Sequence, residues 1–232
     1  MILDGATVLV IGGAGFIGSH VVAALLHTDV AKVVVYDNFA RGKVEHLSSS
    51  LRDPRCEVFR DGGDIRDVDV LSKAVSNADA VVHLAAMWLL HSKEYPRTAF
   101  EVNVQGTFNV LEACAQNNIK KLVYSSSASV YGDAVEVPMT EEHPFNNRNF
   151  YGATKIAGEA MARAFHDRYG LDYVGLRYMN VYGPNQDQGA AYSGVIPVML
   201  NKIESNETPE INGAGSQAYD FITARDVARC NV

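Results

Sequence analysis

The 232-residue sequence predicts an α/β fold with a doubly wound parallel sheet. Short runs rich in Val, Ile and Tyr alternate along the chain with longer segments of helical period, as in successive βαβ units. The short runs are apolar on both faces, as expected for strands that helices cover on both sides of a sheet. A glycine-rich loop joins the first run to the first helical segment, and such a loop is typical of this fold.

Six segments are expected to form the strands of one sheet. Each is short, rich in β-branched or aromatic residues and followed by turn-forming residues. They cover residues 7–12, 32–37, 56–62, 78–86, 121–127 and 172–178. Segments between them have the apolar spacing of helices. Those helices are expected over residues 16–26, 67–77, 99–118 and 151–170.

The composition of the chain changes after Tyr178. The stretch YMNVYGPNQDQGAAYSG is rich in Gly, Pro and Asn, which favour turns and loops over regular elements. A further helix is expected from about residue 224, where the sequence reads ARDVARC. We therefore predict two parts, a sheet domain over residues 1–178 and a small lobe over residues 179–232.

Charge and composition exclude several kinds of partner. The formal net charge is −7, which argues against nucleic acid because phosphate binding requires clustered Lys and Arg. No apolar run reaches the ~18 residues that cross a bilayer, and the N-terminus lacks the basic segment of a signal peptide. We therefore expect a cytoplasmic protein with no membrane association. Cys56, Cys114 and Cys230 are widely spaced, which predicts free thiols and no metal site.

The first loop, VIGGAGFIGSH, carries glycines at Gly12, Gly15 and Gly18. Without side chains the loop can turn sharply and let a pyrophosphate approach the backbone, while the free N–H groups of the following helix face the negative charge. Asp37 ends the next predicted strand, where a carboxylate accepts hydrogen bonds from an adenosine ribose. This context predicts a dinucleotide site, and a tight turn without ligand is the alternative.

The same acidic residue bears on the kind of dinucleotide. Asp37 would repel a 2′-phosphate, so NAD is expected rather than NADP. Arg41 and Lys43 follow closely in the sequence and keep NADP open as an alternative.

A second candidate site lies in the segment FYGATKIAGEAM. Tyr151 and Lys155 are one helical turn apart, so both lie on one face of the predicted helix. A free phenol ionises near pH ~10, but a neighbouring ammonium and an oxidised nicotinamide would both favour the phenolate. Tyr151 could then move a proton while the cofactor takes a hydride. An exposed surface pair is the alternative.

Hydroxyl groups cluster where the fifth predicted strand ends, in the run YSSSASVYG. Side chains at the carboxyl end of a parallel strand point into the crevice where ligands bind. One of these hydroxyls could donate to a substrate oxygen. For Ser125, Ser126 and Ser129 we favour the alternative, in which they cap the next turn.

A family resemblance follows from the motifs taken together. The segments GGAGFIG, GDIRD, HLAA, NVQGT, SSSASVYG, YGATK, RYMNVYGP and GAGSQAYDF stand in the order typical of extended short-chain dehydrogenase/reductases. Within these, the chain resembles the NAD-dependent nucleotide-sugar epimerase/dehydratase family, and its UDP-glucose 4-epimerase-like members in particular. The resemblance covers essentially the whole chain and implies a Rossmann NAD-binding domain over residues 1–178 and part of a substrate-binding lobe over residues 179–232.

The resemblance also implies roles for individual residues. Tyr151 is the base and acid, Lys155 holds the nicotinamide ribose and lowers the pKa of Tyr151, and Ser127 is the third catalytic residue. The residues implied in cofactor binding are Gly12, Gly15, Phe16, Ile17, Asp37, Asn38, Asp64, Ile65, Leu84, Ala85, Ala86, Asn103, Tyr151, Lys155 and Tyr178. Those implied in contacts with a nucleotide-sugar substrate are Ser127 and Asn180.

The turn after Ser127 favours one reaction within the family. Related 4,6-dehydratases place acidic residues there, whereas this chain has Ala128, Ser129 and Val130. Elimination of water then lacks its acid and base, while 4-epimerisation of a UDP-hexose, UDP-HexNAc or UDP-hexuronate needs only Tyr151. A 4,6-dehydratase or another sugar-nucleotide oxidoreductase remains an alternative. A further alternative is an NAD-binding sensor or scaffold without turnover.

Three features depart from the resembled pattern. Tyr219 stands where many relatives have an Arg that meets the substrate diphosphate. The loop beside the sugar site is unusually apolar, with Trp88, Leu89 and Leu90, which we interpret as packing. The chain also stops at Val232 inside a predicted helix, so we expect part of the substrate lobe to be missing. Relatives commonly dimerise through the helices containing Asn103 and Tyr151, and a homodimer is expected here.

Overall fold

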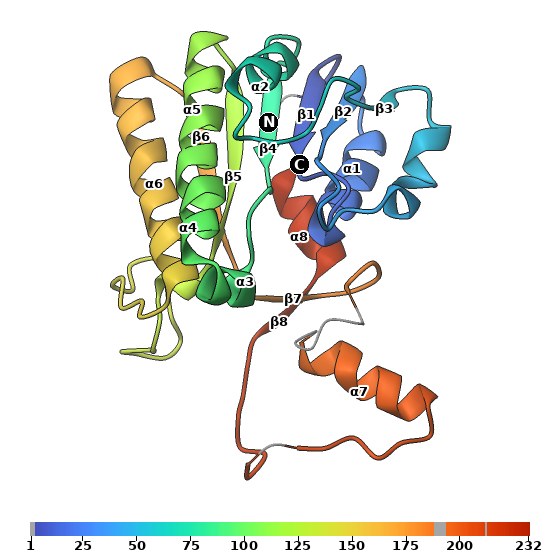
Figure 1. The fold of residues 1–232 in the computed structure, drawn as a ribbon, viewed down its shortest axis with the longest axis vertical. Coiled ribbons are helices and arrows are strands. Elements are labelled where there is room, and N and C mark those ends of the chain that lie inside the picture. Colours follow the sequence, from blue (N-terminus) through green and yellow to red (C-terminus); the bar gives the residue numbers. More distant parts are fainter. Residues whose placement is uncertain (1–2, 188–193, 212) are drawn as a thin grey trace.

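The computed structural model describes residues 3–187, 194–211 and 213–232, and its centre is a parallel six-stranded sheet (Figure 1). The order across the sheet is β3-β2-β1-β4-β5-β6. The strands are β1 (Thr7–Ile11), β2 (Lys32–Tyr36), β3 (Cys56–Val58), β4 (Ala80–His83), β5 (Lys121–Ser127) and β6 (Tyr173–Tyr178). All six predicted strands are confirmed, although most are shorter than expected because their ends turn into the loops at the edge of the sheet.

The strand order places a crevice at a defined edge of the sheet. The chain builds β1, β2 and β3 in one direction and then returns to place β4 on the other side of β1. In such sheets ligands bind outside the carboxyl ends of the strands, at the point where the direction reverses. The doubly wound prediction is therefore confirmed, with the switch between β1 and β4.

Helices cover both faces of the sheet (Figure 1). The α-helices are α1 (Phe16–Leu26), α2 (Val68–Val75), α3 (Leu89–Glu94), α4 (Pro96–Ala99), α5 (Thr107–Gln116), α6 (Phe150–Tyr169), α7 (Val195–Glu204) and α8 (Ala224–Asn231). Short 3₁₀ turns are η1 (Val44–Leu47), η2 (Ser50–Arg52) and η4 (Ala128–Val130). The single helix expected over residues 99–118 is instead α4, a π-helical segment η3 (Phe100–Gly106) and α5 in succession.

The core consists of two clusters, one on each face of the sheet, because successive side chains of β1 point to opposite faces. Leu9 and Ile11 pack with residues of α2, α5 and α6, whereas Val8 and Val10 pack on the opposite face with α1. Ala228 of α8 belongs to the same cluster as Val8 and Val10, and α8 packs against α1. Apolar residues on both faces of a strand are thus explained by the two helical layers.

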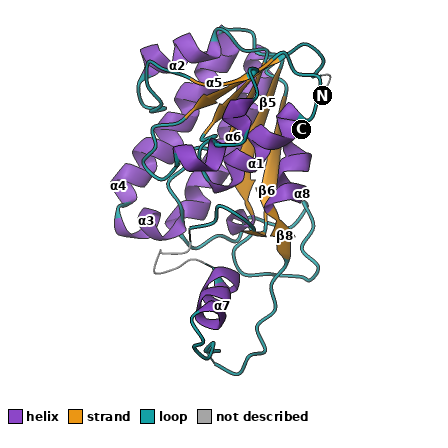
Figure 2. Ribbon diagram, turned by 90° about the vertical axis from the view of Figure 1, so that its right-hand side faces the viewer, coloured by secondary structure: helices purple, strands orange, loops and turns teal. Residues whose placement is uncertain are grey.

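The segment after β6 leaves the sheet and returns to it. β7 (Asn180–Tyr182) and β8 (Phe221–Thr223) form a separate parallel pair below the carboxyl edge of the sheet, and α7 stands apart from the sheet (Figure 2). The helix predicted from residue 224 is confirmed as α8. Residues 188–193 and 212, which belong to the predicted lobe, lie outside the described residues. The division at residue 178 stays a prediction.

Candidate active site

The glycine loop lies against the end of β4. Gly12 has a φ of +82°, and a Cβ atom at this position would lie 2.7 Å from the backbone nitrogen of Ala85. The backbone nitrogens of Leu84 and Ala85 donate to the carbonyl of Ile11 at 2.8 and 3.1 Å. Only a residue without a side chain fits between β1 and β4 here, so the loop passes close to the end of β4.

Helix α1 begins without a side-chain cap. Gly15 precedes the helix and offers no acceptor, and the first turn, which starts with Phe16 and Ile17, contains no acidic residue. In contrast, Asp67, Asn149 and Thr223 cap α2, α6 and α8 with their side chains. The unsatisfied N–H groups of α1 therefore suit an anionic group such as a pyrophosphate.

Asp37, at the end of β2, hydrogen-bonds both the glycine loop and the loop that follows β2. Its carboxylate accepts hydrogen bonds from the backbone nitrogens of Ala14 at 2.9 Å and Phe39 at 2.8 Å. Burial raises the pKa of Asp37, and these hydrogen bonds oppose the rise. A carboxylate offers about four acceptor positions, so capacity for a ribose hydroxyl is left. The next residue, Asn38, uses its side-chain oxygen to accept from the nitrogen of Ala40 at 3.0 Å.

Two residues implied in cofactor binding, Asp64 and Ile65, follow β3. Asp64 forms an ion pair with Arg66 at 2.6 Å, and this neighbour lowers the pKa of Asp64. The side chain of Ile65 is buried, and the amide nitrogen of Asn109 donates to its carbonyl at 3.0 Å. The neighbouring carbonyl of Asp64 accepts from the Tyr36 hydroxyl at 2.8 Å. Hydrogen bonds to their carbonyl groups therefore hold both residues in place.

Asn103 joins the loop after β4 to the helix that carries the Tyr–Lys pair. Its side-chain oxygen accepts from the nitrogen of Met87 at 2.6 Å, and its Nδ2 donates to the Met87 carbonyl at 2.9 Å and to the Thr154 hydroxyl at 3.1 Å. Asn103 lies in the π-helical segment η3, and such segments are frequent at functional sites. The loop from Ala85 and Ala86 onwards is thus tied to α6.

Lys155 and Tyr151 lie on the first turns of α6. The Nζ atom of Lys155 donates to the carbonyl of Ser125 at 2.6 Å and lies 5.7 Å from the centre of the Tyr151 ring. Burial lowers the pKa of Lys155 to about 8. Burial also raises the pKa of Tyr151 to about 12, and a hydrogen bond with the Ser127 hydroxyl opposes this rise. The three predicted catalytic residues are thus brought together at the carboxyl end of β5.

The positive charge of Lys155 does not offset the effect of burial on Tyr151. Without a further cation, the phenol keeps its proton at neutral pH. The lowering of its pKa by Lys155 that the resemblance implied stays a prediction for the state that contains cofactor.

The serine run differs in detail from the expectation. Ser127 caps the next turn, because its hydroxyl accepts from the nitrogen of Ser129 at 3.1 Å. Ser126, for which a capping role was favoured, instead donates to the carboxylate of Glu159 in α6 at 2.5 Å. Arg177 of β6 donates to the same carboxylate at 3.0 and 2.8 Å. This ion pair was not predicted from the sequence, although Glu159 lies one turn after Lys155 and therefore on the same face of α6.

Two predicted residues use their side chains within the fold. The Tyr178 hydroxyl donates to the side-chain oxygen of Asn231 in α8 at 2.9 Å. The side-chain nitrogen of Asn180 donates to the carbonyl of Asp220 at 3.0 Å, next to the β7–β8 pair. Their roles toward cofactor and substrate stay predictions.

Comparisons with known proteins agree with this geometry. The sequence profile of the NAD dependent epimerase/dehydratase family matches residues 8–232. The chain belongs to this family. A putative UDP-glucose 4-epimerase of Methanocaldococcus jannaschii is 38% identical over 97% of this chain and 72% of its own length.

Two solved structures extend this likeness to the fold. A UDP-N-acetylglucosamine 4-epimerase from Methanobrevibacter ruminantium M1, solved with UDP-N-acetylmuramic acid, superimposes with a TM-score of 0.91 at 38% identity, over 99% of this chain and 72% of that chain. A Thermus thermophilus UDP-glucose 4-epimerase in complex with NAD gives a TM-score of 0.84 at 36% identity, over 96% and 72% of the two chains. NAD is the cofactor of the family, and the glycine loop, the uncapped α1 and Asp37 fit it.

Within residues 3–187, 194–211 and 213–232, no helix is long and apolar enough to cross a membrane. No group of three or more His, Cys, Asp or Glu side chains in the same ranges is placed to hold a metal ion.

Proposed function

We propose that this chain catalyses the NAD-dependent 4-epimerisation of a nucleotide sugar, with a UDP-sugar as substrate. The observation that carries the proposal is the grouping of Ser127, Tyr151 and Lys155 at the crevice edge of the sheet. A sensor without turnover has no use for this proton-transfer set. For cofactor contacts, we propose the glycine loop, Asp37 and the other residues that the family resemblance implied.

Each of the three side chains has a distinct task. Bound NAD supplies the group that accepts a hydride from the sugar carbon and returns it. The Tyr151 Oη atom takes the proton of the sugar 4-hydroxyl and gives it back, and the Ser127 hydroxyl is placed to hydrogen-bond both phenol and substrate. Lys155, held by the Ser125 carbonyl at 2.6 Å, places a positive charge beside the phenol and stabilises the phenolate.

The turn after β5 supports epimerisation over dehydration. Ser127 is followed by η4, which consists of Ala128, Ser129 and Val130, and Val130 is fully buried. This turn brings no carboxylate toward the site. Epimerisation requires no second acid or base, because Tyr151 both takes the proton of the sugar 4-hydroxyl and returns it.

The test is product analysis with three substrates. The purified chain is incubated separately with UDP-glucose, UDP-N-acetylglucosamine and UDP-glucuronate, and products are identified by mass and by NMR of the sugar. A C4 epimer of unchanged mass supports the proposal and identifies the sugar. Loss of the mass of water establishes a dehydratase instead. NAD binding with no conversion of any nucleotide sugar favours the sensor.

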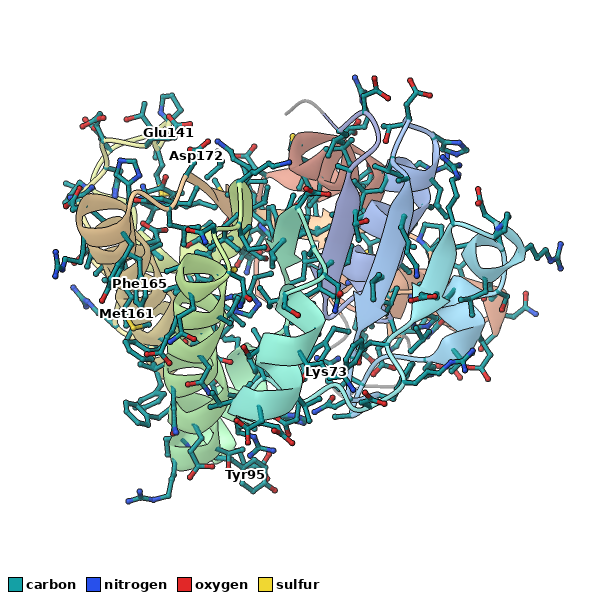
Figure 3. All side chains as sticks on the ribbon, turned by 90° about the horizontal axis from the view of Figure 1, so that it is seen from above. Lys73, Tyr95, Glu141, Met161, Phe165 and Asp172 are labelled. Atoms are coloured by element: carbon teal, nitrogen blue, oxygen red, sulfur yellow. The ribbon has the colours of Figure 1, made fainter. Side chains whose placement is uncertain are left out.

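We also propose that the chain forms a homodimer through α5 and α6. Phe108 of α5 is 41% exposed, and its ring lies edge-on to Phe165 of α6 at 5.5 Å. Figure 3 shows Phe165 and Met161 beside α5 and α6. The molar mass in solution tests this proposal. Phe108→Glu, which places a charge on that face, is expected to give monomers, whereas Phe145→Glu on an exposed loop is expected to leave the mass unchanged.

We place the protein in the cytoplasm. Cys56, Cys114 and Cys230 are free, and the first two are buried. Free thiols accord with a reducing compartment, where disulfides are rare. Fractionation of cells that produce the chain, with detection in the cytosolic fraction, tests this assignment.

A further inference from the structure

One cation–π pair joins two loops that flank the glycine loop. The guanidinium carbon of Arg41 lies 4.6 Å from the centre of the Trp88 ring. Arg41 follows β2 and Trp88 follows β4, and these two strands are the neighbours of β1 on either side. The pair therefore bridges the carboxyl end of β1, which is where the glycine loop begins.

The loop that carries Arg41 rests directly on the glycine loop. The backbone nitrogen of Lys43 donates to the carbonyl of Ala14 at 3.1 Å, and a ring nitrogen of His46 lies 2.9 Å from the same carbonyl oxygen. At Gly42 a Cβ atom would lie 2.8 Å from the Asp37 carboxylate and 2.9 Å from the Ala14 side chain. Arg41 is thus positioned relative to both the pyrophosphate loop and the ribose-binding carboxylate.

Hydrogen bonds also hold the loop that carries Trp88 in place. The preceding residue, Met87, makes two hydrogen bonds with Asn103, and the carbonyl of Trp88 accepts from the nitrogen of Ser92 at 2.9 Å. The Trp88 ring also contacts His91 edge-on at 5.4 Å. Contacts other than the one with Arg41 therefore hold Trp88 in place, and its indole ring supports the guanidinium.

Within the described part of the chain, the charge of Arg41 is poorly neutralised. Among the described residues its polar partner is the Asp187 carboxylate at 3.7 Å, with side chains 44% and 49% exposed. A pair this long and exposed contributes little to stability, and a guanidinium has five N–H donors to satisfy. Two other cations near the crevice are engaged more closely, since Arg66 pairs with Asp64 at 2.6 Å and Lys155 donates to the carbonyl of Ser125.

A second unsatisfied donor belongs to the same pair. The indole Nε1 of Trp88 is buried and has no hydrogen-bond partner within the described part of the chain. A buried N–H without an acceptor is costly, so it indicates a ligand atom or water at that place. Nearby, α1 also lacks a side-chain acceptor.

We propose that Arg41 binds the pyrophosphate of NAD, with the Trp88 ring holding its guanidinium above the glycine loop and the indole N–H supplying a further donor. The bridge closes over the cofactor between β2 and β4. It also commits Arg41 to the pyrophosphate, and this removes one of the two cations, Arg41 and Lys43, that could accommodate the 2′-phosphate of NADP. The inference rests on NAD binding and adds two residues to that site.

The test compares three ligands on the chain freed of bound NAD. NAD and ADP-ribose contain the pyrophosphate, and adenosine does not. Arg41→Gln is expected to weaken binding of NAD and ADP-ribose by about 10- to 100-fold, as for the loss of a charge-assisted hydrogen bond, and to change adenosine binding less than about twofold. The matched control is Arg168→Gln, which removes an exposed cation–π pair with Tyr169 at 5.7 Å and should leave all three affinities unchanged.

The protein carries its own reporter for this experiment. Trp88 is the single tryptophan of the chain, so its fluorescence reports directly on the proposed bridge, and we expect NAD to change its emission with the half-saturation found by calorimetry. Arg41→Lys, which keeps the charge without the planar fork, should bind NAD with intermediate affinity. Melting temperatures of each variant establish that it is folded.

The possible outcomes separate the inference from the function on which it rests. The inference is overturned if Arg41→Gln binds NAD as tightly as the wild type does. It is also overturned if the variant loses affinity for adenosine as much as for NAD, because that would indicate a disturbed adenosine pocket. An emission of Trp88 that does not respond to bound NAD also counts against it. If the wild-type chain binds no NAD at all, the cofactor assignment itself fails.

Discussion

The hydroxyl of Tyr124 occupies the space that a side chain at Gly158 would need. A Cβ atom at Gly158 would lie 2.1 Å from the Tyr124 hydroxyl oxygen and 2.5 Å from the ring carbon that bears it. Tyr124 lies in β5 and Gly158 in α6, so the helix approaches the sheet closely at this point. The approach brings the Lys155 Nζ atom 5.2 Å from the Tyr124 ring centre and within 2.6 Å of the Ser125 carbonyl.

Substitution of Gly158 by Ala should therefore impair both stability and turnover. The added methyl group forces α6 away from β5, and overpacking of this kind costs about 1–3 kcal/mol. Since Lys155 and Tyr151 move with the helix, kcat should fall more than KM rises. Urea unfolding and steady-state kinetics measure the two effects. Ala153→Gly, at an exposed position of the same helix, controls for changes in helix propensity.

Tyr124→Phe should rescue this variant in part. The second substitution removes the 2.1 Å contact but leaves the ring carbon at 2.5 Å. We expect the double variant to recover roughly half of the lost stability, since the two sites are in direct contact and their effects do not add. Strictly additive effects would show that the clash is not what Gly158 avoids.

Tyr151→Phe should retain NAD and lose turnover. The ring and its packing remain, while the oxygen that carries the proton is lost, and general acid–base catalysis contributes about 10²–10⁴-fold. The measurements are the fraction of NAD that copurifies and the rate of epimer formation. Tyr169→Phe, at a position of α6 that is 63% exposed, should behave as wild type. Undiminished turnover of Tyr151→Phe would exclude the proposed role of the phenol.

Lys155 should make stability rise with pH in the alkaline range when NAD is absent. Its pKa is about 8 in the folded chain against an ordinary value of 10.5, so between these values the unfolded state binds more protons and stability increases with pH. Lys155→Met lacks this contribution. From pH 8 to 10.5 the wild type should gain stability over the variant by up to roughly 3 kcal/mol, because one pH unit of pKa difference is worth about 1.4 kcal/mol. The exposed substitution Lys93→Met should show no such trend, and parallel pH curves for wild type and Lys155→Met would contradict the explanation.

The ion pair between Glu159 and Arg177 should be strongly coupled. The side chains are only 16% and 20% exposed, and Glu159→Gln leaves the guanidinium without its charge partner, which costs roughly 2–4 kcal/mol. Arg177→Met alone should be comparably harmful. The double variant should cost clearly less than the sum of the two, as measured by urea unfolding. Arg177 also donates to the carbonyl of Glu141 at 3.0 Å, so proteolysis of the loop over residues 131–146 should quicken in the Arg177→Met variant.

The sequence predicted the sheet well because its strands follow a local rule. Apolar runs on both faces occur where helices cover both sides, and the order of elements along the chain constrains their neighbours. The glycine loop, Asp37 and the Tyr–Lys pair could be proposed from the sequence because each is set by spacing within one or two elements. The π-helical turn at Phe100–Gly106 was not, since the residues there have ordinary helical spacing and the distortion depends on the contacts of Asn103 with Met87 and Thr154.

Contacts between distant segments were the part that could not be predicted. Arg41 and Trp88 were noted separately, one as a residue that kept NADP open and the other as part of an apolar loop. Their pairing depends on β2 and β4 lying on either side of β1, which is a property of the whole sheet. The carboxylate of Glu159 joins Ser126 to Arg177 in a similar way. Spacing along the chain carries no signal for such contacts.

The packing of α8 on α1 has a consequence for the synthesis of the protein. Ala228 shares one apolar cluster with Val8 and Val22, so a helix that is synthesised early is covered by one that is synthesised much later. During synthesis part of the α1 surface stays uncovered until α8 has emerged, and an uncovered apolar surface favours aggregation. We therefore expect chaperones that bind nascent chains to engage α1, and to release it once α8 has emerged from the ribosome.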